Sequence, residues 1–236
     1  MKTFSRILLA VSAAAIVTLS MSSCVFRVEG LKSIKPLMPE GDLVTKTVIP
    51  QDGFNSVGMA GSFDMEVIQS QDGPKIEVTT YENLQSSFHA VLKGNDLSLY
   101  FKSDSTSNIV LKDTKVVIYV KDLKGVSLAG SGDLKVAPFI TENDFTLSVA
   151  GSGDASIASI SCADLTISVA GSGDIDASGI ACKSLDASIA GSGDVVLSGT
   201  ADDATYTVAG SGDIDARSLK AGDVKASKAG SGEIRY

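Results

Sequence analysis

The stretch Ala170-Gly171-Ser172-Gly173-Asp174 decides the fold, because the same five residues recur along the second half of the chain. Successive copies, counted from their first glycines, lie 21, 20, 20, 19 and 20 residues apart. A period this steady is typical of stacked repeat units. We call this stretch the AGSGD motif. Its copies begin at Ala129, Ala150, Ala170, Ala190, Ala209 and Ala229, and the last copy ends in Glu233 instead of Asp.

The residues on both sides of the AGSGD motif alternate between apolar and polar, which is the signature of a β-strand. Before the motif, Leu165, Ile167 and Val169 are apolar at every second position, and Ile175 continues the pattern after it. In the same phase, the two glycines point inward whereas Ser and Asp point outward. Glycine serves where a chain bends tightly or where two backbones meet closely, so the motif predicts the corner of a coil.

One turn of a flattened or triangular solenoid needs about twenty residues. We therefore predict an all-β, single-domain parallel β-helix, or β-solenoid, with regular coils from about residue 124. The weaker strand patterns before it, which include the degenerate copy Ala60–Asp64, are expected to form an N-terminal cap. No helix is expected. The strands predicted in the cap are Val44–Ile49, Phe63–Ile68, Lys75–Thr80, Phe88–Leu92, Leu97–Phe101 and Val116–Val120.

Residues 1–23 have the features of an export signal: a basic start followed by the apolar run Ile7–Leu19, which is too short to span a bilayer. Met21-Ser22-Ser23-Cys24 resembles a bacterial lipobox. That resemblance implies cleavage before Cys24, acylation of this residue by chains such as palmitate, and a membrane anchor. The alternative is an ordinary secretory signal followed by an incidental cysteine. Residues 24–43 are predicted to form a lipid-anchored tether and residues 44–236 the β-solenoid domain.

The chain is acidic. Removal of residues 1–23 takes away two basic side chains, which leaves 18 basic against 28 acidic side chains and a formal charge of −10. This balance argues against binding to nucleic acid and to anionic membrane surfaces.

The recurring AGSGD motif, together with Tyr81-Glu82-Asn83-Leu84 and the stretch Gly94–Leu99, resembles the head GIN domain family over residues 44–236. The resemblance implies an adhesin-like lipoprotein of the bacterial cell envelope, attached to the outer membrane, with no established chemistry. An acidic run directly after the lipidated Cys would resemble a surface-export signal, but none follows Cys24. The protein is therefore expected on either the surface or the periplasmic side of the outer membrane. A fold alone does not settle a function.

The Asp residues of the motif are the obvious candidate site, because coils of equal length stack them at about 5 Å. One interpretation is a bound cation such as calcium, which favours clustered carboxylates. The other is that each Asp accepts backbone N–H groups at its glycine-rich corner, with no cofactor. The candidate metal ligands are Asp154, Asp174, Asp194 and Asp213.

Cys162 and Cys182 are twenty residues apart and in the same phase, so they are predicted to lie on neighbouring coils. A disulfide is one interpretation, because an exported protein meets oxidising conditions. The other is that both are small core residues, since Ala201 and Ala221 take the same place in later coils.

Three functional hypotheses follow. The first, which we favour, is a non-catalytic envelope scaffold that binds an unknown protein or glycan through its outer faces. The second is a polysaccharide-acting enzyme, which would need converging carboxylates with an Arg or Lys in a cleft. The third is a small-ligand or lipid-binding module in the N-terminal strands. His89 is the one His of the chain and has no nucleophile motif beside it, and Asp104-Ser105-Thr106 resembles a short O-glycosylation signal.

Overall fold

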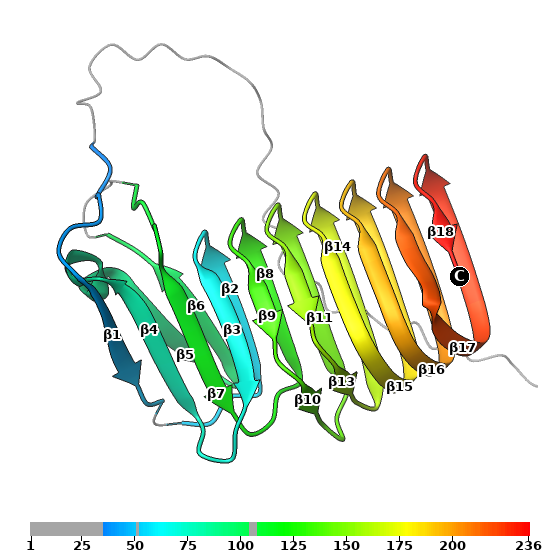
Figure 1. Cartoon of the computed structure of the whole chain (residues 1–236), viewed down its shortest axis with the longest axis horizontal. Coiled ribbons are helices and arrows are strands. Elements are labelled where there is room, and N and C mark those ends of the chain that lie inside the picture. Colours follow the sequence, from blue (N-terminus) through cyan, green and yellow to red (C-terminus); the bar gives the residue numbers. More distant parts are fainter. Residues whose placement is uncertain (1–34, 51, 104–107) are drawn as a thin grey trace, which may run out of the picture. The chain divides into compact units, whose positions relative to one another are not determined.

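The protein is described by a computed structural model over residues 35–50, 52–103 and 108–236, and these residues form the predicted all-β solenoid (Figure 1). The predicted export signal, Cys24 and the motif at residues 104–106 lie outside the described residues. The strands are β1 Leu43–Val48, β2 Ser56–Gly61, β3 Asp64–Gln69, β4 Lys75–Tyr81, β5 Phe88–Lys93, β6 Asp96–Phe101, β7 Lys115–Val120, β8 Gly125–Gly130, β9 Leu134–Val136, β10 Phe139–Ile140, β11 Phe145–Gly151, β12 Ala155–Ile157, β13 Ile160–Ser161, β14 Asp164–Gly171, β15 Ile175–Gly191, β16 Val195–Gly210, β17 Ile214–Gly230 and β18 Ile234–Arg235.

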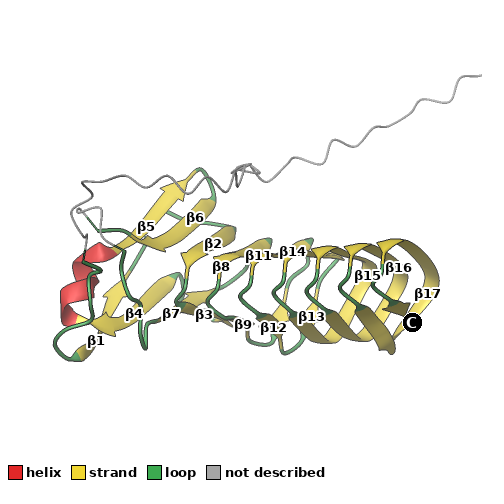
Figure 2. Cartoon of the chain, turned by 90° about the horizontal axis from the view of Figure 1, so that it is seen from above, coloured by secondary structure: helices red, strands yellow, loops and turns green. Residues whose placement is uncertain are grey.

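The coils stack in parallel and in register, as the constant period predicts. β8, β11, β14 and the later parts of β15, β16 and β17 form one flank, on which each AGSGD alanine pairs with the alanine of the next coil. β9, β12 and the early parts of the same long strands form the opposite flank. Figure 2 shows the coils following one another along the solenoid. The AGSGD motif lies where the chain passes from the first flank to the second.

The degenerate copy Ala60–Asp64 belongs to the first coil of the stack, although it precedes the next copy by 69 residues. Ala60 pairs with Ala129 and Gly61 with Gly130, and β3 pairs with β9. The intervening chain extends the stack in the other direction, where β6 lies parallel to β2 and β7 parallel to β3. These early strands therefore belong to the same solenoid as the regular coils.

The N-terminal end is closed by a change from parallel to antiparallel pairing. β5 runs antiparallel to β6, β4 antiparallel to β7, and β1 antiparallel to β4. Phe63 of the first coil contacts Phe101, and Phe101 contacts Phe88, with ring centroids 5.3 Å apart in both pairs. The predicted cap is confirmed, and its apolar side chains pack on the first coil.

Three features differ from the sequence prediction. Strand β2, Ser56–Gly61, was not among the predicted strands, although it ends in the degenerate copy of the motif. The expectation that no helix occurs was wrong, because Glu82–Ser87 form a 3₁₀ helix in which Leu84 is buried. Six residues are too few to show helical periodicity. In addition, residues of the predicted tether contact the cap: the Glu40 N–H donates to Asn83 Oδ1 at 2.9 Å. Lys35–Tyr236 form one compact unit.

Candidate functional site

The two glycines of the AGSGD motif are required because equivalent corners touch through their backbones. A Cβ added to Gly151 would lie 2.3 Å from the carbonyl oxygen of Gly130, and one added to Gly153 would lie 2.2 Å from that of Gly132. Gly151 also has φ +130°, a conformation that side chains disfavour. The predicted close approach of two backbones is thus the one that the structure shows.

The Asp of the motif completes the hydrogen bonding of this corner. The N–H groups of Ser172 and Gly173 both donate to the carbonyl of Gly151 in the preceding coil. The N–H of Asp174 donates instead to Oδ1 of Asp154, at 2.9 Å. A side-chain acceptor therefore satisfies an amide that the corner leaves without a carbonyl. The same bond joins Asp133 to Asp64, Asp194 to Asp174, Asp213 to Asp194 and Glu233 to Asp213.

The irregular copies of the motif follow from this arrangement. Glu233 ends the stack of described coils, so no later corner presents an amide to its carboxylate, which pairs with Arg235 instead. Phe63 stands where later copies have their second glycine, because no earlier motif lies against it. Asp is needed where a following coil must be held, and glycine where a preceding motif is touched.

These contacts support the structural interpretation of the Asp residues over the metal interpretation. Asp154, Asp174 and Asp194 are exposed, and each holds the amide of the next coil. Within the described residues, no three His, Cys, Asp or Glu side chains are grouped closely enough to hold a metal ion. In one respect the expectation was incomplete, because the accepted N–H belongs to the next coil and not to the corner of the same coil.

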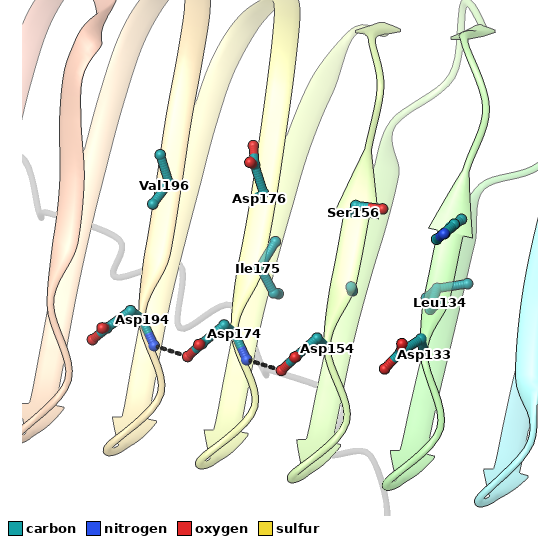
Figure 3. A pocket seen from close by; sticks show the side chains of 11 residues that line it. Asp133, Leu134, Asp154, Ser156, Asp174, Ile175, Asp176, Asp194 and Val196 are labelled. Carbon is teal, nitrogen blue, oxygen red and sulfur yellow. Dashed lines mark hydrogen bonds between the residues drawn. The ribbon is translucent and has the colours of Figure 1, made fainter.

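A shallow groove of about 430 Å³ runs beside these Asp residues across several coils (Figure 3). One side of it is formed by the exposed motif residues Asp133, Asp154, Asp174 and Asp194. The other side is formed by the outward residues two positions further on, among them Lys135, Ser156, Asp176 and Val196, and a second groove of about 520 Å³ continues beyond them. The floor consists of the inward residues between, such as Leu134, Ala155 and Ile175.

The outward residues two positions after each motif Asp form a second column, which we call the variable column. Strand pairing aligns its members one above another across the described coils. Unlike the Asp column, it changes chemistry from coil to coil. Its members are Glu66, Lys135, Ser156, Asp176, Val196, Asp215 and Arg235. No pattern in the sequence singles out this column, because its members share no chemistry.

Ion pairs engage both ends of the variable column. Glu66 pairs with Lys115, and Arg217 donates to Asp215 and holds the pKa of that carboxyl at about 2. In the middle, Asp176 accepts only a hydrogen bond from Ser178 among the described contacts, and Val196 is 48% exposed. The centre of the groove therefore presents side chains that do not hold the coils together.

Cys162 and Cys182 lie on neighbouring coils as predicted, and both are free thiols. The Cys162 N–H donates to the carbonyl of Ala181, and Cys182 pairs with Ala201 of the next coil. Burial raises the pKa of Cys162 to about 12 and that of Cys182 to about 11. In this structure Cys162 is buried and Cys182 is half-buried against the inner lining.

The remaining candidates are not brought together into a site. His89 stacks on Tyr100 across β5 and β6, with ring centroids 5.2 Å apart, and lies in the cap away from the motif corners. The N-terminal strands pack on the first coil, which is the arrangement of a cap and not of a ligand pocket. Among the described residues, no helix has both the length and the apolar character needed to cross a membrane.

Solved structures with a similar fold include proteins of two Parabacteroides species. A putative lipid binding protein from Parabacteroides distasonis is 30% identical, with a TM-score of 0.79, 85% of this chain and 84% of that chain being covered. A putative adhesin from the same species is 21% identical (TM-score 0.78, 85% and 84% covered), and one from Parabacteroides merdae is 23% identical (TM-score 0.74, 85% and 83% covered). No curated protein matches the chain.

The family described as "Putative auto-transporter adhesin, head GIN domain" matches residues 53–181 and 159–236, which together take in the first coil, the cap except for β1, and every AGSGD corner. The resemblance seen in the sequence is therefore confirmed, and the chain belongs to the head GIN domain family.

Proposed function

We propose that the protein is a non-catalytic, lipid-anchored scaffold of the cell envelope that binds a protein or glycan partner along the groove beside the variable column. The observation that carries this proposal is the contrast between two adjacent columns. In the motif column, Asp carboxylates accept backbone N–H groups of the following coils. The variable column has a different side chain at each coil, and the residues at its centre do not hold neighbouring coils together.

A uniform column is what stacking demands, because each coil must meet the next in the same way. The residues of the variable column do not have to make the same contact in every coil. Their side chains can therefore differ from coil to coil and can select a partner. At its centre the variable column offers one cation, one hydroxyl, one carboxylate and one apolar side chain in a row, spaced by the strand separation of about 4.8 Å. An extended chain of sugar rings or an extended peptide fits such a flat, open row better than a compact metabolite does.

The catalytic alternative has less support. Lys135 does lie among carboxylates in this groove, but Asp154 and Asp174 are engaged by the amides of the following coils. The lipid-binding alternative draws on a 30% identical relative described in those terms. The cap of this chain, however, packs its phenylalanines on the first coil.

The anchor is part of the proposal. Cleavage before Cys24 and acylation of that residue would attach the solenoid to the outer membrane through residues 25–34. Mass spectrometry of the N-terminal peptide from the full-length protein, expressed in a Gram-negative host, tests this step. We expect an acylated Cys24 and release of the Cys24→Ser variant from the membrane fraction. An unmodified N-terminus would refute the anchor.

Binding is tested with cells displaying the full chain on arrays of purified polysaccharides, mucin glycans and extracellular-matrix proteins. We expect the variant Lys135→Ala/Asp176→Ala/Val196→Ser to lose at least about tenfold in affinity for the ligand found. The matched control Thr146→Ala/Thr166→Ala/Thr205→Ala changes three outward residues of the opposite flank and should bind normally. Equal loss in both variants would refute the groove, and release of cleaved polysaccharide products would refute a non-catalytic role.

A further inference from the structure

The last long strand, β17, is a sheet edge. It pairs with β16 along its whole length, but on its other side only Ile214 and Asp215 are covered, by β18. From Ala216 to Gly230 no strand of the described chain lies on that side. Such an edge is a template on which another copy can add its own strand. End-to-end association of solenoids would follow unless something opposes it.

One residue breaks the inner lining of the solenoid at this edge. Pairing aligns Lys228 with Val208 in β16, and Val208 with Ile189 in β15. Val208 and Ile189 are 1% and 2% exposed, and the same column continues through Val169, Val149 and Leu128, all of them buried. Lys228 is exposed, and no strand of the described chain covers it.

Beside Lys228 the end of the solenoid is incompletely filled. A hollow of about 320 Å³ is lined by Ala226, Ile234 and Tyr236, by Lys228 itself, and by the polar residues Ser227 and Glu233. The Glu233 carboxylate is already paired with Arg235. Tyr236 is 65% exposed, and its ring lies 6.0 Å from that of buried Tyr206. The end therefore presents apolar surface together with backbone N–H and C=O groups of β17 that no other strand pairs. Without a charged residue in the inner column, it would favour association with a second copy.

We propose that Lys228 is a stop residue that prevents a second copy from stacking on β17. Any strand added to this edge, in either direction, would enclose the Lys228 ammonium between two coils, where no carboxylate of the inner columns can pair with it. Burial of an unpaired ammonium opposes association strongly. The charge of this end adds a weaker effect: residues 217–236 hold five basic and two acidic side chains, whereas residues 136–216 hold one basic and twelve acidic. Two such ends repel each other at low salt.

Any coil that followed on this edge would have to bury the same lysine. The proposal is tested with Lys228→Val, which continues the Val208 column, and with Lys228→Met, which keeps the length of the side chain and removes only the charge. The matched control is Lys225→Thr. It removes an equal charge from the same strand but points outward, in the column of Thr205.

Sedimentation velocity of the mature chain, residues 24–236 with Cys24→Ser in every sample, measures association from about 5 to 500 µM. We expect the parent protein and Lys225→Thr to stay monomeric, and both Lys228 variants to dimerise with an association constant at least about 100-fold higher. Hydrogen exchange should show new protection of the amides in residues 216–230 only in the Lys228 variants. The proposal is overturned if folded Lys228→Val and Lys228→Met stay monomeric, if Lys225→Thr associates equally, or if the protected amides lie outside β17.

Discussion

The role of the motif Asp can be separated from its charge by comparing two substitutions of Asp194. Oδ1 of Asp194 accepts the N–H of Asp213 at 2.8 Å. Asn keeps a carbonyl oxygen at this place, whereas Ala leaves the amide of Asp213 without its acceptor. Both substitutions remove the same charge, and hence the same repulsion from the neighbouring carboxylates of the column. The difference between the two variants therefore isolates the hydrogen bond.

The magnitudes can be worked from the geometry. Two carboxylates about 5 Å apart repel by about 0.8 kcal/mol in bulk water before salt screens them. Loss of a side-chain acceptor for a backbone amide costs about 1 kcal/mol, as at the N-cap of a helix. Asp194→Asn should therefore stay within about 0.5 kcal/mol of the parent protein in unfolding free energy, or exceed it, because relief of repulsion offsets the weaker bond. Asp194→Ala should be about 1 kcal/mol less stable than Asp194→Asn.

Urea unfolding measures the global difference, and hydrogen exchange of the Asp213 amide measures it locally, where about fivefold faster exchange is expected in Asp194→Ala than in Asp194→Asn. Glu233 supplies the control, because its carboxylate holds no following coil: Glu233→Ala and Glu233→Gln should be equally stable. Equal stability of the two Asp194 variants would refute the hydrogen-bond reasoning. A calcium-dependent rise in melting temperature of the parent protein, absent from Asp194→Asn, would restore the metal interpretation.

Two further predictions follow from the same geometry. Gly153→Ala places a Cβ 2.2 Å from the carbonyl oxygen of Gly132 and should lower the free energy of urea unfolding by more than about 3 kcal/mol. The control Gly53→Ala, whose Cβ would have no heavy atom within 4 Å, should change it by less than about 0.5 kcal/mol. Similar values for the two variants would disprove the close approach. Because burial raises the pKa of Cys162 to about 12 and of Cys182 to about 11, both thiols should react with a disulfide reagent at pH 8 far more slowly than in urea. Their contribution to stability is present below pH 9, the ordinary thiol value, and should decline as the pH rises toward 11 to 12, which unfolding measurements against pH can check; rapid reaction in the folded state would contradict this burial.

The sequence by itself determined the architecture, because every coil repeats the same physical demand. Alternation by two assigned the strands, a constant period assigned the stacking, and the inward phase of the glycines assigned the corners. The family followed from the same residues. In the cap the alternation was weaker but sufficient for six strands. The 3₁₀ helix at Glu82–Ser87 was not predicted, because its two short turns bury only Leu84 and Ser87 and show no periodic apolar pattern.

Only the tertiary structure decided what the outward residues do. The sequence showed a column of Asp, but the N–H that Asp154, Asp174 or Asp194 accepts lies 19 or 20 residues further along the chain, on the next coil, and no local pattern reveals it. The same holds for the variable column beside the groove, whose members resemble ordinary surface residues until pairing aligns them. It holds for Lys228 as well, since a lysine in an apolar column becomes intelligible once β17 is seen to be an edge. The repeat in the sequence determines the strands, corners and stacking that all coils share. Only the contacts between coils show which outward residues hold the coils together and which do not.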